Sequence, residues 1–359
     1  MIFVKKPLFT GIWGNCHIQG IAVDRKNGYI YYSFTTKLIK ATLDGKIIGS
    51  VDGLVGHLGC IAFNEADGCV YGSLEYKNDV IGKGILSAID SDSVFSNAFY
   101  VVKFDAAKID RFDIPAENSD IMSAVYLKEV IDDYNGTGID KEGNAVLHKY
   151  GCSGIDGLTF APLPGKSEND GLYLYVAYGI YGDFNRDDND HQILLCYDFS
   201  DWSTYAQPLN QKNMHQRGPS APLNKFFVRT GNTHYGVQNL EYDRFTKSIF
   251  MAVYKGSKPD FPNFTLFAVD AESSPKIETL STTSETVETL SLRTIGIYDE
   301  KSGIYGWNFP FGATGLYSFG DSKWLISHNK TTPDGQCSFI YPYVWNRTTP
   351  FHCEIPVLE

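Results

Sequence analysis

Histidine and acidic residues in this chain stand at the edges of strand-like segments. His17, His57 and His234 come just before apolar runs, and Glu75 and His328 come at the ends of others. Histidine binds metal ions through a ring nitrogen and transfers protons near neutral pH, while a carboxylate can serve as an acid, a base or a metal ligand. Brought together, these residues would form a metal site or a proton-transfer site.

Asp156 is a second acidic candidate, in the segment Gly154-Ile-Asp-Gly157. An aspartate beside glycine also suits turn geometry, so a structural role competes with a chemical one. If the histidines do not bind metal, we expect one of them to pair with Glu75 or Asp156. The predicted catalytic residues are Glu75, Asp156 and His17. The predicted ligands of a divalent metal, calcium or zinc, are His17, His57 and His234.

An acidic loop offers a separate metal site. Asp183, Asn185 and Asp187 have the alternating spacing of a calcium-binding loop. Asp188 then stands where the EF-hand pattern has glycine, and Leu194 stands where it has glutamate. The competing interpretation is a solvated acidic turn.

Five short segments resemble copies of one motif and predict the elements that position these residues. Each begins with small, polar and aliphatic residues, ends in an apolar run, and precedes a second strand-like run. The copies are 17–24, 57–64, 154–160, 236–243 and 313–319. Such repetition is typical of a β-propeller. We expect an all-β, five-bladed propeller that forms a single domain over residues 1–359, with blades starting near 17, 57, 154, 236 and 313. A six-bladed ring is the alternative, with the extra blade between residues 105 and 151.

Closing such a ring pairs the two ends of the chain, because closure removes free sheet edges. The candidate closing strands are Ile2–Phe9 and Phe351–Val357. We also expect outer strands near Met122–Val130 in the second blade and Thr294–Tyr298 in the fourth. The Ser/Thr/Glu-rich stretch 271–291 is expected to be a solvated loop or a mobile hairpin.

The first blade carries a resemblance to known propellers. Gly20-Ile-Ala-Val-Asp24, Gly28-Tyr-Ile-Tyr31 and Asp44-Gly45 resemble the repeat of NHL and SMP-30/gluconolactonase-like propellers. The acidic metal set of those lactonases does not map onto this chain residue by residue. Five blades are also similar to the arabinanase- and fructosidase-like glycosidases, which place carboxylates around the axis. The nearest carboxylates here are Glu75, Asp156 and Glu241.

The resemblance also implies where a ligand would bind. In propellers as a class, the starts of the inner strands and the loops after the second strands share one face of the ring. The residues expected to bind a ligand there are Gln19, His57, Tyr178, His234, Gln238, Tyr254 and His328.

The composition of the chain limits the classes of molecule that it is expected to bind. The net charge of −11 and a pI near 5.2 disfavour nucleic acid and anionic membranes. The sequence contains neither a membrane-length apolar segment nor a phosphate-binding glycine motif, so we expect no nucleotide cofactor. We expect a monomer that binds a small molecule or a glycan. The start of the chain favours a cytoplasmic protein, or a secreted one if a signal peptide has been removed.

The seven cysteines lack any CxxC pair, and we expect most to be free thiols, with Cys60 and Cys69 as the pair that could meet. Two function classes remain. The first is a hydrolase with a polar His/carboxylate site that acts on a carbohydrate or lactone-like molecule. The second is a non-catalytic propeller that binds a glycan or a protein.

Overall fold

The protein is a five-bladed β-propeller, seen here in a computed structural model that describes residues 6–357. Helices account for 8% of residues and strands for 45%, which confirms the all-β class. Blade 1 contains β2 (Ile18–Asp24), β3 (Tyr29–Phe34), β4 (Lys37–Thr42) and β5 (Ile47–Asp52). Blade 2 contains β6 (His57–Asn64), β7 (Cys69–Tyr76), β8 (Ala98–Asp105) and β10 (Met122–Tyr126).

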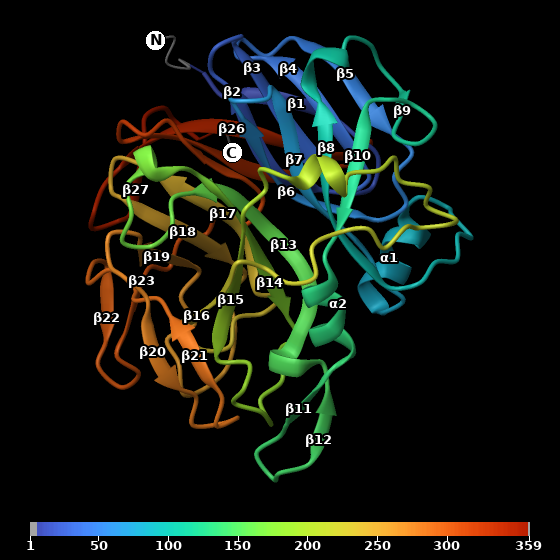
Figure 1. The fold of residues 1–359 in the computed structure, drawn as a ribbon. Helices are drawn as coiled ribbons and strands as arrows, with labels where there is room; N and C mark the ends of the chain where they lie inside the picture. The colour runs from blue at the N-terminus through green and yellow to red at the C-terminus, as the bar shows by residue number, and fades with distance from the viewer. Residues whose placement is uncertain (1–5, 358–359) are drawn as a thin grey trace.

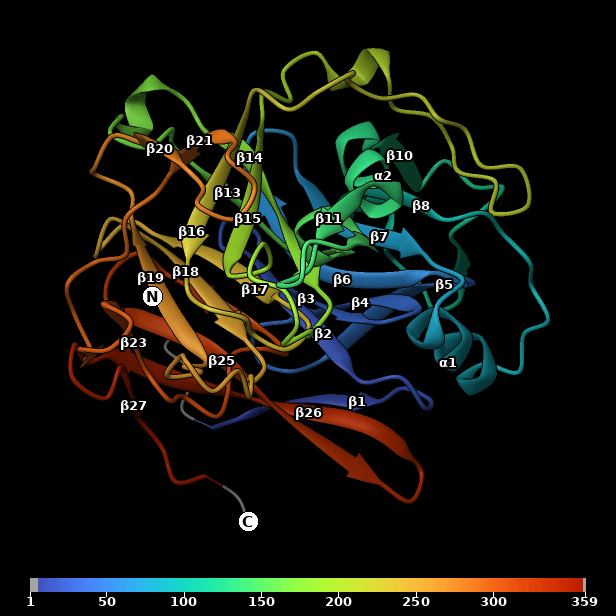
Figure 2. The ribbon, with the colours of Figure 1, turned by 90° about the horizontal axis from the view of Figure 1, so that it is seen from below.

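The other three blades complete the ring. Blade 3 contains β13 (Cys152–Ala161), β14 (Tyr173–Ile180), β15 (His191–Tyr197) and β16 (Asn224–Arg229). Blade 4 contains β17 (Val237–Asp243), β18 (Ser248–Val253) and β19 (Leu266–Asp270). Blade 5 contains β24 (Leu316–Ser318), β25 (Lys323–Thr332) and β26 (Gly335–Trp345). The inner strands β2, β6, β13, β17 and β24 contact one another in that order, and β24 also contacts β2, which closes the ring. The first four of these strands lie side by side in Figure 2.

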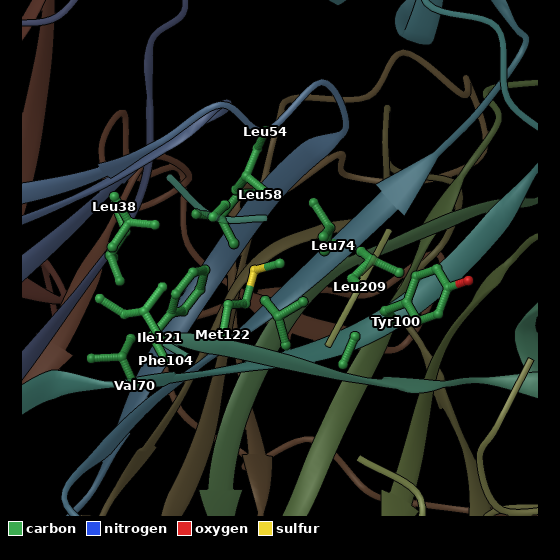
Figure 3. Close-up of a cluster of buried hydrophobic side chains, with 14 of the residues drawn as sticks. Leu38, Leu54, Leu58, Val70, Leu74, Tyr100, Phe104, Ile121, Met122 and Leu209 are labelled. Atoms are coloured by element: carbon green, nitrogen blue, oxygen red, sulfur yellow. The ribbon is translucent and has the colours of Figure 1, made fainter. Parts of the chain in front are cut away.

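Apolar side chains fill the spaces between neighbouring blades. Among the described residues they form five clusters, one at each junction of two blades. Figure 3 shows the cluster between blades 1 and 2. Strand β3 explains the pattern: Tyr31 packs into that cluster, while Ile30 and Tyr32 pack into the cluster between blades 1 and 5. Since successive residues of a strand face opposite sides, a strand between two clusters is apolar almost throughout.

The two ends of the chain meet on blade 5, as expected. Strand β1 (Leu8–Ile12) pairs antiparallel with β26, beside which it runs in Figure 2, and β27 (Phe351–Cys353) pairs with the other end of β26. Buried Thr10 adds side-chain bonds to this pairing. Its Oγ1 donates to the Ser338 carbonyl at 3.1 Å and accepts from the Ser338 amide at 2.9 Å. The predicted closing residues Ile2–Lys5 lie outside the described part of the chain.

One predicted strand is shorter than expected, and another belongs to a different sheet. The run Met122–Val130 ends as a strand at Tyr126, and Val130 lies in α2 (Lys128–Asn135). Val130 and Tyr134 are four residues apart, so they share one face of this helix and pack between blades 2 and 3. In blade 4, β22 (Ile297–Asp299) pairs with β23 (Ile304–Gly306) in a separate hairpin. Leu292 and Trp307 form isolated bridges to β19 instead.

The long insertions form short strands and hairpins at the outside of the ring. Within the described residues they add no further blade. Strand β9 (Ile114–Pro115) extends blade 1, and the hairpin β20 (Lys276–Thr279) and β21 (Thr286–Thr289) extends blade 3. The hairpin β11 (Thr137–Ile139) and β12 (Ala145–Leu147) projects from the body in Figure 1. The sixth blade considered between residues 105 and 151 is therefore not formed.

All seven cysteines are free thiols, and most are buried. Cys60 illustrates why: its thiol donates to the Leu158 carbonyl of the neighbouring inner strand at 3.4 Å rather than pairing with Cys69. Across residues 6–357 no helix is long and apolar enough to cross a membrane.

Ring closure predicts the effect of a single substitution. Thr10→Ala leaves the buried Ser338 amide without its acceptor, so we expect the free energy of unfolding to fall by about 1–3 kcal/mol. Urea denaturation measures this change. The exposed Thr282→Ala is the matched control, and an equal change in the two variants would contradict the closing role of Thr10.

Candidate functional site

A cavity of about 400 Å³ lies at the mouth of the ring where the inner strands begin. Side chains from blades 1 to 4 line it, and α1 (Val80–Ala88), which follows β7, forms one wall through Ile81, Ile85 and Ala88. The polar and aromatic residues around it are Asn15, His17, Gln19, Thr35, His57, Glu75, Lys77, Ser153, Asp156, Tyr235, Gln238 and Tyr254.

Irregularities in the inner strands direct side chains into this cavity. The pairing register shifts between Ile18 and Gly20 in β2, between Ile155 and Leu158 in β13, and between Val237 and Asn239 in β17. Each shift is a bulge, which bends a strand locally and re-aims the residue that it contains. The residues carried by these bulges and lining the cavity are Gln19, Asp156 and Gln238.

Two glycines give the carboxylates room. A Cβ on Gly59, in the corresponding bulge of β6, would lie 2.1 Å from Asp156 Oδ1. A Cβ on Gly154 would lie 2.0 Å from Glu75 Oε2, and its φ of 119° is one that other residues rarely adopt. A side chain at either position would displace a carboxylate.

Glu75 is a buried carboxylate whose oxygens are bonded on several sides. Its Oε1 lies 2.6 Å from the Lys77 ammonium and 3.2 Å from His57 Nδ1, and its Oε2 accepts from the Ile155 amide at 3.0 Å. Lys77 also donates to the Ser153 carbonyl at 2.7 Å. Burial raises the pKa of Glu75, but Lys77 and His57 outweigh it and hold that pKa below its ordinary value. Glu75 is thus an ionised partner for His57.

Asp156 has the opposite electrostatic environment. Its Oδ1 accepts from the Cys60 amide at 3.3 Å, and no ammonium is paired with it among the described residues. Burial raises the pKa of Asp156 to about 7, with His57 opposing the rise and Glu75 adding to it. Burial lowers the pKa of His57, but Asp156 and Glu75 raise it overall. Asp156 and His57 therefore each shift the pKa of the other and titrate as an interacting pair.

His17 is held neutral at the side of the cavity. Burial lowers its pKa to about 4, and the charge of His57 adds to this effect. Its Nε2 lies 3.2 Å from Gln19 Nε2 and 3.4 Å from the Tyr254 hydroxyl. Gln19 also donates to Thr35 Oγ1 at 3.1 Å. A neutral His17 can exchange hydrogen bonds with a ligand without carrying charge.

Three predicted site residues lie elsewhere. His234 is exposed, with its ring 3.9 Å from that of Tyr235, and does not line the cavity. The Tyr178 hydroxyl donates to Asp133 Oδ2 in α2 at 2.8 Å. His328 Nε2 lies 2.8 Å from the Tyr343 hydroxyl, and its ring stacks on Phe311. Gly179 lines the axial cavity, and Ser327 lines a second cavity. Successive residues of a strand face opposite sides, so the neighbouring Tyr178 and His328 point away from these cavities.

Glu241, the third carboxylate considered, lies at the far end of the inner strands. It lines a separate cavity with Arg25, Tyr242 and Arg244, and it accepts from the Ser318 amide at 2.8 Å. It is therefore not part of the site formed by Glu75 and Asp156.

The ammonium group of Lys258 lies among the carboxylates of the acidic loop that contains Asp183, Asn185 and Asp187. The Lys258 ammonium lies 3.4 Å from Asp187 Oδ1, 2.5 Å from Asp190 Oδ1, and 2.6 Å from the Arg186 carbonyl. Asp183 instead accepts from the Asn185 amide at 2.8 Å. Lys258 thus neutralises carboxylates that a calcium ion would need.

Metal binding remains a prediction for the chain as a whole. Within residues 6–357 no three His, Cys, Asp or Glu side chains are arranged to hold a metal ion. His17 and His57 both line the cavity, without His234 beside them. Elemental analysis of purified protein tests the expected calcium or zinc.

Lys77 and Tyr235 also line the cavity, at the face of the ring where a ligand was expected, although neither was assigned a catalytic, metal-binding or ligand-binding role. The signal for Lys77 was its spacing from Glu75, since residues two apart on an extended segment face the same side. Tyr235 lies in a loop with a φ of 65°, and nothing in the sequence marks its direction.

Comparisons with known proteins do not assign the chain to a family. No protein-family model and no curated protein matches the chain. A GH43 β-1,3-galactosidase with galactodeoxynojirimycin is 10% identical, with 94% of this chain and 95% of that chain covered and a TM-score of 0.42. The PQQ domain of pyranose dehydrogenase from Coprinopsis cinerea is 13% identical, with 89% and 81% covered and a TM-score of 0.34. The Dos1 propeller is 9% identical, with 95% and 71% covered and a TM-score of 0.33. At these levels the activity must be argued from the side chains of this chain.

The buried charges predict strong coupling between Glu75 and Lys77. Lys77→Met and Glu75→Gln each leave the other charge poorly compensated, so each should lower the free energy of unfolding by about 3–5 kcal/mol. The double variant should lose less than the sum of the two losses. Urea denaturation measures all three. Lys103→Met, which breaks the partly exposed pair with Asp67, should cost only about 0–1 kcal/mol, and a similar cost for Lys77→Met would refute the coupling.

Asp156 predicts a pH-dependent stability. Because its pKa is raised on folding, the folded protein binds more protons than the unfolded one between about pH 4 and pH 7, so this group makes stability fall as pH rises through that window. Asp156→Asn cannot ionise. The free energy of unfolding of Asp156→Asn minus that of the wild type should therefore increase as pH rises through this window, by up to about 4 kcal/mol. Urea denaturation at pH 4 and pH 8 checks this, and a constant difference would contradict the raised pKa.

Proposed function

We propose that this protein is a hydrolase that acts on a carbohydrate or lactone-like molecule in the axial cavity. The observation that carries the proposal is the convergence of His57, Glu75 and Asp156 from three strands on one cavity. A volume of about 400 Å³ suits a small molecule. Paired carboxyl groups with pKa values shifted in opposite directions are typical of acid/base catalysis.

His57 is the base of this proposal. The ionised Glu75 favours a proton on His57 Nδ1, because this nitrogen lies 3.2 Å from Glu75 Oε1 and can donate to it. That tautomer leaves Nε2 as an acceptor, and no hydrogen bond to it is present among the described residues. Glu75 therefore orients the imidazole and stabilises the positive charge that His57 gains when it accepts a proton, in the manner in which a carboxylate supports a catalytic histidine.

Asp156 is the proton donor. His57 Nε2 takes a proton from a water molecule, and the water oxygen bonds to the carbon under attack. The bond from that carbon to the leaving oxygen breaks, and Asp156 gives its proton to this oxygen. Solvent then carries the proton from His57 back to Asp156, so the pair is restored with one water consumed.

The walls suit a molecule with polar edges and an apolar face. Gln19, Gln238 and His17 offer hydrogen bonds, while Ile81 and Ile85 of α1 offer an apolar surface. Sugars and their lactones combine hydroxyl groups with C–H faces that pack on such side chains and on the ring of Tyr254. A non-catalytic glycan-binding propeller would use the same walls, and the absence of turnover would favour it.

Turnover of p-nitrophenyl glycosides and aldonolactones tests the proposal. Asp156→Asn and His57→Gln should each lower kcat by about 10²–10⁴-fold, since each removes one proton-transfer group. Wild-type kcat should fall as pH rises through about 7, where Asp156 loses its proton, and should also fall at lower pH, where His57 becomes protonated. His234→Ala, outside the cavity, is the matched histidine control and should retain activity. Binding without turnover by the wild type, or equal losses in all three variants, would reject the hydrolase.

A further inference from the structure

A second cavity of about 800 Å³ adjoins the axial cavity over blades 4 and 5. His17 and Tyr254 line both cavities, so the two meet at these side chains. The second cavity is bounded by the ends of β18 and β25 and by the segment 308–314, which leads into β24. Together the two cavities cover parts of all five blades on one face of the ring.

The second cavity differs from the first in its chemistry. Asn308, Asn329 and Gln336 provide side-chain amides, Thr314 provides a hydroxyl, and Phe311 provides a ring. Among the described residues that line it, none is Asp or Glu, and Lys255 is the only Lys or Arg. This wall holds hydrogen-bonding groups and an aromatic face but no acid of its own, which suits binding rather than proton transfer.

Two of these amides are available to a ligand. Asn308 and Asn329 are exposed, and no hydrogen bond within the described chain uses either side-chain amide. Each amide can donate and accept at once, as neighbouring hydroxyl groups of a sugar require. The exposed ammonium of Lys255 favours a neutral or acidic sugar over a cationic one.

We propose that the substrate is an oligosaccharide that spans both cavities. One sugar occupies the axial cavity beside His57 and Asp156, and the following sugars lie over blades 4 and 5 against Asn308 and Asn329. The chain passes His17 and Tyr254 where the cavities meet. The inference rests on the proposed function and deepens it, since a cavity of about 400 Å³ already holds one small ligand and the second is larger.

The shared wall suits this passage. His17 stays uncharged because its pKa is lowered to about 4, so a neutral sugar can pass without facing a buried charge. The Tyr254 hydroxyl lies 3.4 Å from His17 Nε2, which fixes its ring between the two cavities. A flat ring at this boundary offers a stacking surface at the bond between two sugars.

A glycan array tests the inference with the full chain. The probe is a set of defined neutral and uronate-containing glycans of one to six sugars, applied to Asp156→Asn so that turnover during the measurement is small. We expect binding of chains of two or more sugars and little binding of monosaccharides. Adding Asn308→Ala and Asn329→Ala should weaken oligosaccharide binding about tenfold or more through the lost hydrogen bonds. Asn213→Ala, an exposed asparagine outside both cavities, is the matched control and should change nothing.

Each outcome decides the inference. Equal binding of single sugars and longer chains, no effect of the two asparagine substitutions, or no binding of any glycan overturns it. Length-dependent binding that these substitutions weaken supports it, even if the wild type cleaves none of the bound glycans, in which case only the hydrolase fails. Turnover of single-sugar substrates by the wild type, together with oligosaccharide binding that the two substitutions leave unchanged, retains the hydrolase and overturns the oligosaccharide.

Discussion

The site depends on the ion pair and hydrogen bonds of one buried carboxylate, that of Glu75. A charge removed from water is tolerated only when its oxygens are bonded and a counter-charge lies nearby. Lys77 supplies the charge, His57 and the Ile155 amide supply hydrogen bonds, and Gly154 leaves the space that a Cβ would fill. Because these partners come from β6, from the end of β7 and from β13, the carboxylate joins blades 2 and 3 at the place where the cavity opens.

The same arrangement separates the roles of two carboxyl groups that line one cavity. Glu75 has a lysine beside it, and its pKa is lowered; Asp156 has none, and burial raises its pKa to about 7. The bulges of the inner strands make this possible, because they place Asp156 in β13 against Gly59 in β6. In a regular strand, the Asp156 side chain would instead face blade 2 or blade 4. The apolar clusters between these blades and blade 3 leave no room for a carboxyl group.

Much of the fold followed from local pattern. The five motif copies predicted five blades, because each inner strand packs between two others and repeats the same small and apolar positions. The insertions were harder to predict. Thr294–Tyr298 has strand-like residues, but only Ile297 and Tyr298 of it form a strand, and they pair with the hairpin strand β23 rather than with blade 4. Strand composition shows that a segment can pair, whereas the partner is chosen by contacts distant in sequence.

The sequence by itself determined which residue types stand at the starts of the inner strands: His17 and Gln19, His57, Asp156 and Gln238 all followed from the repeat. Tertiary structure decided which of the candidate side chains share the cavity. His328 faces an aromatic cluster because its strand alternates, and His234 lies exposed on a loop. Helix α1 lines the cavity together with residues of four blades, and Lys258 occupies the acidic loop, through contacts between segments far apart in the chain. A repeat fixes positions along each strand, but the direction of a side chain and its charged neighbours exist only once the ring has closed.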